Sequence, residues 1–152
     1  MSEKEVLLKL TALCARGEHC QHDMLEKMSR WGVDNAIQAS VMAYLTDHHY
    51  VDDERYTRAY VNDKIKYNHW GRRKVEQGLW QKHIDPSLQQ RVLDDIDDSL
   101  YVEILRPLLQ QKRRTTRADS DYELNQKLMK FALSRGFTYD IIRQCIDTPE
   151  TD

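Results

Sequence analysis

The chain has 152 residues, of which 40% are hydrophobic and 32% charged, and its formal net charge is −2. That length is enough for one ordinary domain, but the low apolar fraction favours small helical units stacked in a row over one thick core. A pI of about 6.3 argues against a general polyanion-binding protein, so any affinity for nucleic acid has to come from a local patch.

The cysteines and the hydropathy pattern indicate a reducing compartment. Cys14, Cys20 and Cys145 are few and odd in number, which does not fit a disulfide framework. We find no signal peptide and no apolar run near ~18 residues, so we expect a cytoplasmic chain that does not contact a membrane. No pattern of an obligate dimer seam is present, and we expect a monomer.

The spacing of apolar residues predicts an all-α protein with an internal repeat. Only five Gly and three Pro are present, and no run alternates apolar and polar residues as a half-buried strand does. Val33, Ile84 and Phe137 lie 51 and 53 residues apart, and each is followed four and eight residues later by further apolar side chains. The sequence therefore predicts three tandem three-helix repeats of about 50 residues in an elongated, curved array. We place them at 1–49, 50–97 and 98–152.

The first repeat, 1–49, has a leading helix near 3–15 and a closing helix that begins after Asp34, a good N-cap residue. Trp31 lies at the turn before that helix and is expected in the core. Cys14, His19, Cys20 and His22 lack the paired spacing of a zinc site, so we predict no metal centre.

The second repeat, 50–97, carries a local excess of positive charge. Asp52 is a good N-cap for a helix over 52–66, and 68–71 breaks it. From Arg55 to Lys82 the chain has eight basic residues against two acidic ones, a net +6 in a chain of −2. We therefore predict contact with DNA or an acidic protein groove along a basic face made of Arg55, Arg58, Lys64, Lys66, Arg72, Arg73 and Lys74. A solvated helical face is the alternative.

Two tryptophans belong to this repeat. Trp80 lies on the polar side of its helix, with Arg73 and Gln77, opposite Val75 and Leu79. It is either a stacking platform for a base or a side chain that packs on the adjacent repeat, and the cost of exposing tryptophan favours packing. Trp70, in the turn, is interpreted as a plug between helices.

The third repeat, 98–152, opens with a helix near 98–116, which Pro107 is predicted to kink or restart. A second basic island follows, made of Lys112, Arg113, Arg114 and Arg117. It either contacts phosphates or interacts with the dipole of its own helix C-terminus. Residues 148–152 are expected to be a frayed tail.

Several spaced motifs lie in the central and C-terminal parts of the chain. The central stretch has Asp52-Asp53-Glu54-Arg55-Tyr56, then Gly71-Arg72-Arg73-Lys74-Val75, and the C-terminal part has Ser134-Arg135-Gly136-Phe137. Together they resemble the motifs of the RecX family of regulatory proteins. The chain departs from the family pattern at Gly78, where an acidic residue is usual, and at His83, where glycine is usual. The resemblance implies three tandem three-helix repeats.

The resemblance also implies a function. It implies a non-enzymatic regulator that binds the filament of the RecA recombinase and DNA, single-stranded or double-stranded. Such a regulator negatively modulates ATP hydrolysis, strand exchange and the repair (SOS) response. We find no phosphate-binding loop and no triad of catalytic residues, so we predict no enzymatic activity and no cofactor. The alternatives are a sequence-independent DNA-binding protein without a recombinase partner and a helical scaffold that binds only proteins.

Overall fold

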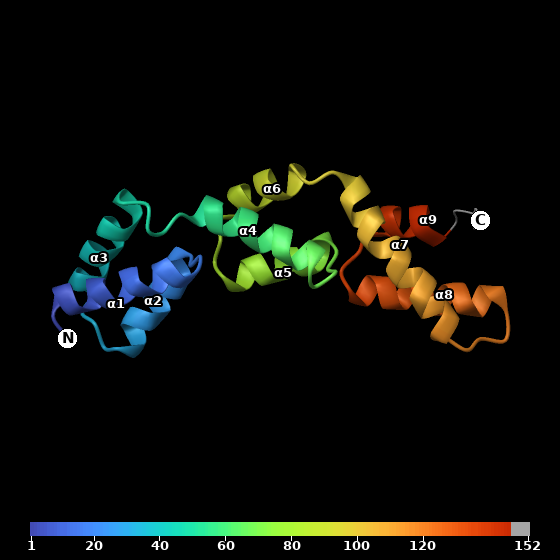
Figure 1. Cartoon of the computed structure of the whole chain (residues 1–152), viewed down its shortest axis with the longest axis horizontal. Helices are drawn as coiled ribbons and strands as arrows, with labels where there is room; N and C mark the ends of the chain where they lie inside the picture. The colour runs from blue at the N-terminus through green and yellow to red at the C-terminus, as the bar shows by residue number, and fades with distance from the viewer. Residues whose placement is uncertain (147–152) are drawn as a thin grey trace. The chain divides into compact units, whose positions relative to one another are not determined.

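The computed structural model describes residues 1–146, and all the regular structure in that part of the chain is helical, as predicted. Residues 147–152, which include the tail expected at 148–152, lie outside the described residues. Within the described range no helix is long and apolar enough to cross a membrane. In chain order (Figure 1) the helices are α1 Glu3–Arg16, α2 Gln21–Arg30, α3 Asn35–Asp47, α4 Asp53–Lys66, α5 Arg72–Gln81, α6 Pro86–Asp94, α7 Asp98–Thr115, α8 Asp121–Ser134 and α9 Tyr139–Ile146.

Capping residues begin these helices largely where the sequence predicts. The Asp52 carboxylate accepts hydrogen bonds from the backbone N–H groups of Glu54 (3.0 Å) and Arg55 (3.1 Å), which confirms the predicted N-cap of α4. Pro86 is the first residue of α6, a position where its missing N–H costs nothing. Asp34 precedes α3 but makes no side-chain capping bond.

The same turn closes the second helix of each predicted repeat. The backbone N–H groups of Val33, Ile84 and Phe137 donate to the carbonyl oxygens five residues earlier, at 3.0, 3.2 and 3.2 Å. The residue before each has a left-handed φ, namely Gly32 (69°), His83 (54°) and Gly136 (90°). This is the geometry of a Schellman motif. Sequence positions 51 and 53 apart therefore do share one local structure.

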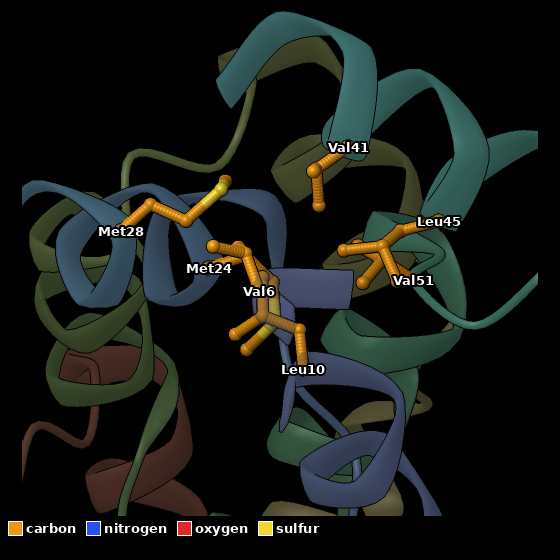
Figure 2. Packing of buried hydrophobic residues seen from close by; sticks show 7 residues of the cluster. All are labelled: Val6, Leu10, Met24, Met28, Val41, Leu45 and Val51. Atoms are coloured by element: carbon orange, nitrogen blue, oxygen red, sulfur yellow. The ribbon is translucent and has the colours of Figure 1, made fainter. Parts of the chain in front are cut away.

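The chain forms two compact units. Unit 1 comprises residues 1–60 and 79–89. Its helices α1, α2 and α3 bury an apolar cluster, which Figure 2 shows converging from all three helices. Within each helix the buried members are four residues apart, so they share one face, and Val51 joins them from the segment after α3. The cluster consists of Val6, Leu10, Met24, Met28, Val41, Leu45 and Val51.

Polar contacts join α2 of unit 1 to residues near the start of α4 and the end of α5. Asp53 accepts a hydrogen bond from the backbone N–H of Gln21 (2.8 Å), and Asp23 accepts one from Lys82 Nζ (2.8 Å). The Cys20 thiol is buried and donates to the Lys82 carbonyl oxygen, and burial raises its pKa to about 11. Such a thiol stays protonated at neutral pH.

Unit 2 comprises residues 61–78 and the chain from 90 on. Helix α7 packs against α8 and α9, and buries Tyr101, Leu105 and Leu109. Of the two effects predicted for Pro107, the restart is wrong, because α7 runs continuously through it, and the kink stays a prediction. Pro107 is exposed, so the missing backbone hydrogen bond lies on the solvent side of the helix.

Two glycines allow α5 to begin directly against the turn that follows α8. The backbone N–H of Gly71 donates to the Arg135 carbonyl oxygen (2.8 Å), and that of Arg73 donates to the Gly136 carbonyl oxygen (3.0 Å). A Cβ on Gly71 would lie 2.3 Å from the Phe137 nitrogen. These bonds satisfy N–H groups that a helix N-terminus leaves free.

The repeat boundaries at 49/50 and 97/98, and the elongated, curved arrangement of the repeats, stay predictions.

Candidate nucleic-acid interface

The two arginines of α4 are held by carboxylates of unit 1. Arg55 Nε lies 2.7 Å from Glu18 Oε1, and its terminal nitrogens donate to the carbonyl oxygens of His49 (3.1 Å) and Tyr50 (3.2 Å). Arg58 Nε lies 3.3 Å from a Glu54 carboxylate oxygen one turn earlier. Both side chains remain partly exposed, but their positive charge is matched by acidic partners. The two guanidinium groups are therefore less available to bind a phosphate than their positions in the sequence indicate.

Arg72 joins α5 to α6 within unit 2. Its guanidinium contacts Glu76 (3.1 Å), Asp94 (2.8 Å) and the side-chain oxygen of Gln90 (2.9 Å). Partial burial works to lower the pKa of Arg72, but the hydrogen bonds to Asp94 and Glu76 outweigh it and raise the pKa. This arginine therefore has a structural role.

Lysines from α4 and α5 surround Trp70 in the turn between these helices. The Nζ atoms of Lys64 and Lys74 each lie 5.0 Å from the centre of the Trp70 ring, within the range of cation–π attraction. The indole is half-buried, and its interpretation as a plug between the helices stays a prediction. It contacts one ammonium group from each of the two helices.

Arg73 and Lys66 are exposed in the same two helices, and within residues 1–146 no carboxylate pairs with either of them. The backbone of Arg73 is fixed by its bond to Gly136, while its side chain makes no ion pair there. An exposed arginine on a fixed backbone can form two parallel hydrogen bonds to a phosphate.

A second aromatic ring gathers cations from α7 and from the end of α8. Lys112 Nζ and the Arg135 guanidinium carbon each lie 5.1 Å from the centre of the Phe131 ring. Arg135 is absent from the predicted contact residues, although it directly precedes the turn against which Gly71 packs. No pattern in the sequence pairs residue 135 with residue 71, because the contact is made by backbone atoms distant along the chain.

The basic island of 112–117 is divided between the end of α7 and the loop after it. Lys112, Arg113 and Arg114 lie in the last turn of α7, as the helix-dipole alternative requires. Arg113 donates to the Asn125 side chain (3.2 Å). Arg114 and Arg117 are exposed, and no ion pair holds them within the described residues.

Two aromatic rings, the cations that contact them, and the exposed cations Lys66 of α4 and Arg73 of α5 form what we call the cation–aromatic cluster of unit 2. Such a pattern suits a nucleic-acid strand, since cations neutralise phosphates and aromatic rings hold those cations in place through cation–π attraction. The members of the cluster are Lys64, Lys66, Trp70, Arg73, Lys74, Lys112, Phe131 and Arg135.

Trp80 has a different environment. Its side chain is 58% exposed, so the prediction that it packs on a neighbouring repeat is wrong. It belongs to unit 1 and lies near the end of α5. The described residues contain no group of three or more His, Cys, Asp or Glu side chains placed to hold a metal ion.

Comparisons with known proteins agree on one family. The model of the second three-helix domain of RecX matches residues 52–93, and the model of the third matches residues 99–146. A regulatory protein RecX of Vibrio campbellii is 25% identical over 152 residues, which covers all of this chain and 94% of the relative. One from Clostridium botulinum strain Alaska E43 is 30% identical over 80% of this chain. The chain spans 57% of the length of that clostridial protein.

Solved structures show the same fold. The crystal structure of RecX from Lactobacillus salivarius has a TM-score of 0.89 at 20% identity, over 95% of this chain and 94% of the other. A second crystal structure, of a regulatory protein RecX, has a TM-score of 0.87 at 18% identity, over 96% of this chain and 73% of the other. The two domain models, the relatives and the shared fold lead to one conclusion: this chain belongs to the RecX family of regulatory proteins.

Proposed function

We propose that this protein binds the filament of the RecA recombinase on single-stranded DNA and limits its ATP hydrolysis and strand exchange. Two findings support the proposal: membership of a family of regulatory proteins, and the cation–aromatic cluster of unit 2. The cluster is the observation that carries it, because it includes exposed cations without acidic partners among the described residues, in a chain of net charge −2.

In this proposal the DNA contact is made chiefly by side chains that have no acidic partner within the described residues. Lys66 and Arg73, together with Arg114 and Arg117 of the island, neutralise phosphates and release counterions. Further positive charge comes from Lys64 and Lys74, which contact the Trp70 ring, and from Arg135, which contacts the Phe131 ring. Arg55, Arg58 and Arg72 contribute less, because carboxylates already match their charge.

A regulator that bound DNA and filament together would resist filament growth at low stoichiometry, since one bound copy would affect many recombinase subunits. The test is the DNA-dependent ATPase rate of the recombinase with this protein present at well under one copy per subunit. We expect the rate to fall and the filaments, seen by electron microscopy, to shorten. An unchanged rate and unchanged filament length would rule out the proposal.

A second candidate is a sequence-independent DNA-binding protein that needs no recombinase. The cation–aromatic cluster favours it too, because phosphates and bases alone could satisfy that surface. This candidate requires a salt-sensitive affinity for DNA that is the same whether the DNA is bare or coated with recombinase. Co-sedimentation on both forms of DNA separates the two candidates.

A further inference from the structure

Unit 1 contains a groove that no residue of the cation–aromatic cluster lines. Its volume is about 710 Å³, and its walls come from the start of α2, the start of α4, the end of α5 and the turn into α6. The described residues that line it all belong to unit 1, so the groove lies within that unit.

Much of the groove wall is apolar. Leu25 is 40% exposed and Trp80 58% exposed, and buried Ile84 also lines the groove. The imidazole rings of His22 and His83 stack at 4.0 Å with an angle of 13° between their planes. A large indole left in water is unfavourable, and tryptophan is enriched among residues that dominate protein interfaces.

A strained turn keeps this wall in place. His83 adopts a φ of 54°, which is uncommon for a residue other than glycine, and its N–H donates to the Trp80 carbonyl oxygen (3.0 Å). The His83 ring lies against that of His22 in α2. The stack therefore ties α2 to the end of the helix that carries Trp80.

The charge of the groove is acidic. Asp53 and Asp85 line it, and among the described residues no lysine or arginine does. The nearest basic residue along the chain, Lys82, donates to Asp23 instead. Burial raises the pKa of Asp53, and the nearby Asp52 and Asp23 carboxylates raise it further, although the hydrogen bond from the Gln21 N–H opposes them. A cation placed beside Asp53 would favour its ionised form. A phosphate would meet repulsion from both carboxylates.

We propose that this groove is the surface that holds the recombinase, and that it receives a segment in which an aliphatic or aromatic side chain lies next to a lysine or arginine. This inference rests on the proposed function and assigns recombinase binding and DNA binding to two different surfaces. The apolar side chain packs on Trp80 and Leu25, and the cation approaches Asp53 and Asp85. In this arrangement the cation–aromatic cluster binds the DNA.

The test compares binding to bare single-stranded DNA with binding to DNA coated by recombinase. Trp80→Ala and Leu25→Ala remove exposed apolar surface, so they leave the core intact. Asp85→Asn removes a charge while keeping an N-cap residue for α6. The matched control is Gln81→Ala, since Gln81 is exposed, neighbours Trp80 on α5 and does not line the groove. Circular dichroism verifies the fold of each variant.

We expect Trp80→Ala to weaken binding to coated DNA by about tenfold or more, Leu25→Ala and Asp85→Asn by less, and none of them to change binding to bare DNA. Equal binding of wild type and Trp80→Ala to coated DNA would overturn the inference and leave the proposed function standing. Weaker binding of Trp80→Ala to bare DNA would overturn it in favour of a base-stacking role. Wild type that binds coated DNA no better than bare DNA would instead overturn the proposed function.

Discussion

At the scale of single residues, the contact between Asp23 and Lys82 is a well-defined ion pair of unit 1. The Nζ and Oδ1 atoms are 2.8 Å apart, and the Asp23 side chain is only 14% exposed. Burial alone would raise the pKa of Asp23, but the hydrogen bond and charge of Lys82 outweigh burial and lower it. The folded state therefore favours the ionised carboxylate.

Asp23→Asn is expected to lower the free energy of unfolding at pH 7 by about 1 kcal/mol, a small value because Lys82 is partly exposed and its charge is screened. Because the folded pKa lies below the ordinary value of 3.8, the contribution of Asp23 is present above that value and disappears as the pH falls through the folded pKa. Urea unfolding at a series of pH values from about 7 down to about 2.5 measures it.

The control for this prediction is Asp34→Asn, because the Asp34 side chain makes no capping bond in the structure. At each pH in the same range, the free energy of unfolding of this variant should be nearly equal to that of the wild type. If the wild type and Asp23→Asn differ equally at the two ends of that range, the ion pair does not set the pH dependence.

Residue roles that depend on local sequence are predictable, and those that depend on distant carboxylates are not. Asp52 is identified as a cap from the residues that follow it, and the structure confirms it. Arg55 lies on the predicted basic face, yet Glu18, 37 residues away, binds its guanidinium. Nothing within one helix turn of Arg55 indicates that partner.

At the scale of elements, the contact between the start of α5 and the end of α8 depends on two glycines. A Cβ on Gly71 would also lie 2.4 Å from the Gly136 carbonyl carbon, and one on Gly136 would lie 2.5 Å from the Lys74 nitrogen. Backbone atoms cannot move aside as the end of a flexible side chain can. The two segments would have to separate to admit a methyl group.

Gly71→Ala is therefore expected to lower the free energy of unfolding by about 2–3 kcal/mol, the range of overpacking in a close contact. Thermal and urea unfolding measure it. Gly17→Ala is the control, because a Cβ at Gly17 meets nothing within 4 Å and its φ of 174° suits any residue. A Gly71→Ala variant as stable as Gly17→Ala would contradict this account of the contact.

Helices and their turns are the part of this fold that the sequence predicts best. The apolar spacing identifies Val33, Ile84 and Phe137 as equivalent, and each makes the same hydrogen bond five residues back. The pairing of α5 with the turn after α8 could not be predicted, since glycine at 71 and 136 shows only that a close approach is possible, not to what. The helix restart predicted at Pro107 is wrong because a proline on the exposed side of a long helix can be tolerated.

At the scale of the whole molecule, the exposed cations without acidic partners among the described residues should determine how DNA binding responds to salt. Lys66→Gln with Arg73→Gln removes two of them. On single-stranded DNA we expect a weaker affinity and a salt dependence whose slope falls by about 0.7 for each phosphate that the variant no longer neutralises. Fluorescence anisotropy across a series of salt concentrations measures both quantities.

Arg55→Gln with Arg58→Gln is the matched control, because it removes the same charge from residues that carboxylates already hold. It should change the slope much less than Lys66→Gln with Arg73→Gln. Equal changes in slope would mean that net charge, and not the placement of the cations, governs the affinity.

The contact between α5 and the turn after α8 has a consequence for how this surface can vary. The hydrogen bonds that fix it come from the main chain of Gly71, Arg73, Arg135 and Gly136. The guanidinium groups of Arg73 and Arg135 take no part in them. Substitution of either side chain can thus change the surface charge that a ligand meets while the main-chain hydrogen bonds stay in place. The charge of this surface can therefore vary without loss of the contact between α5 and the turn after α8.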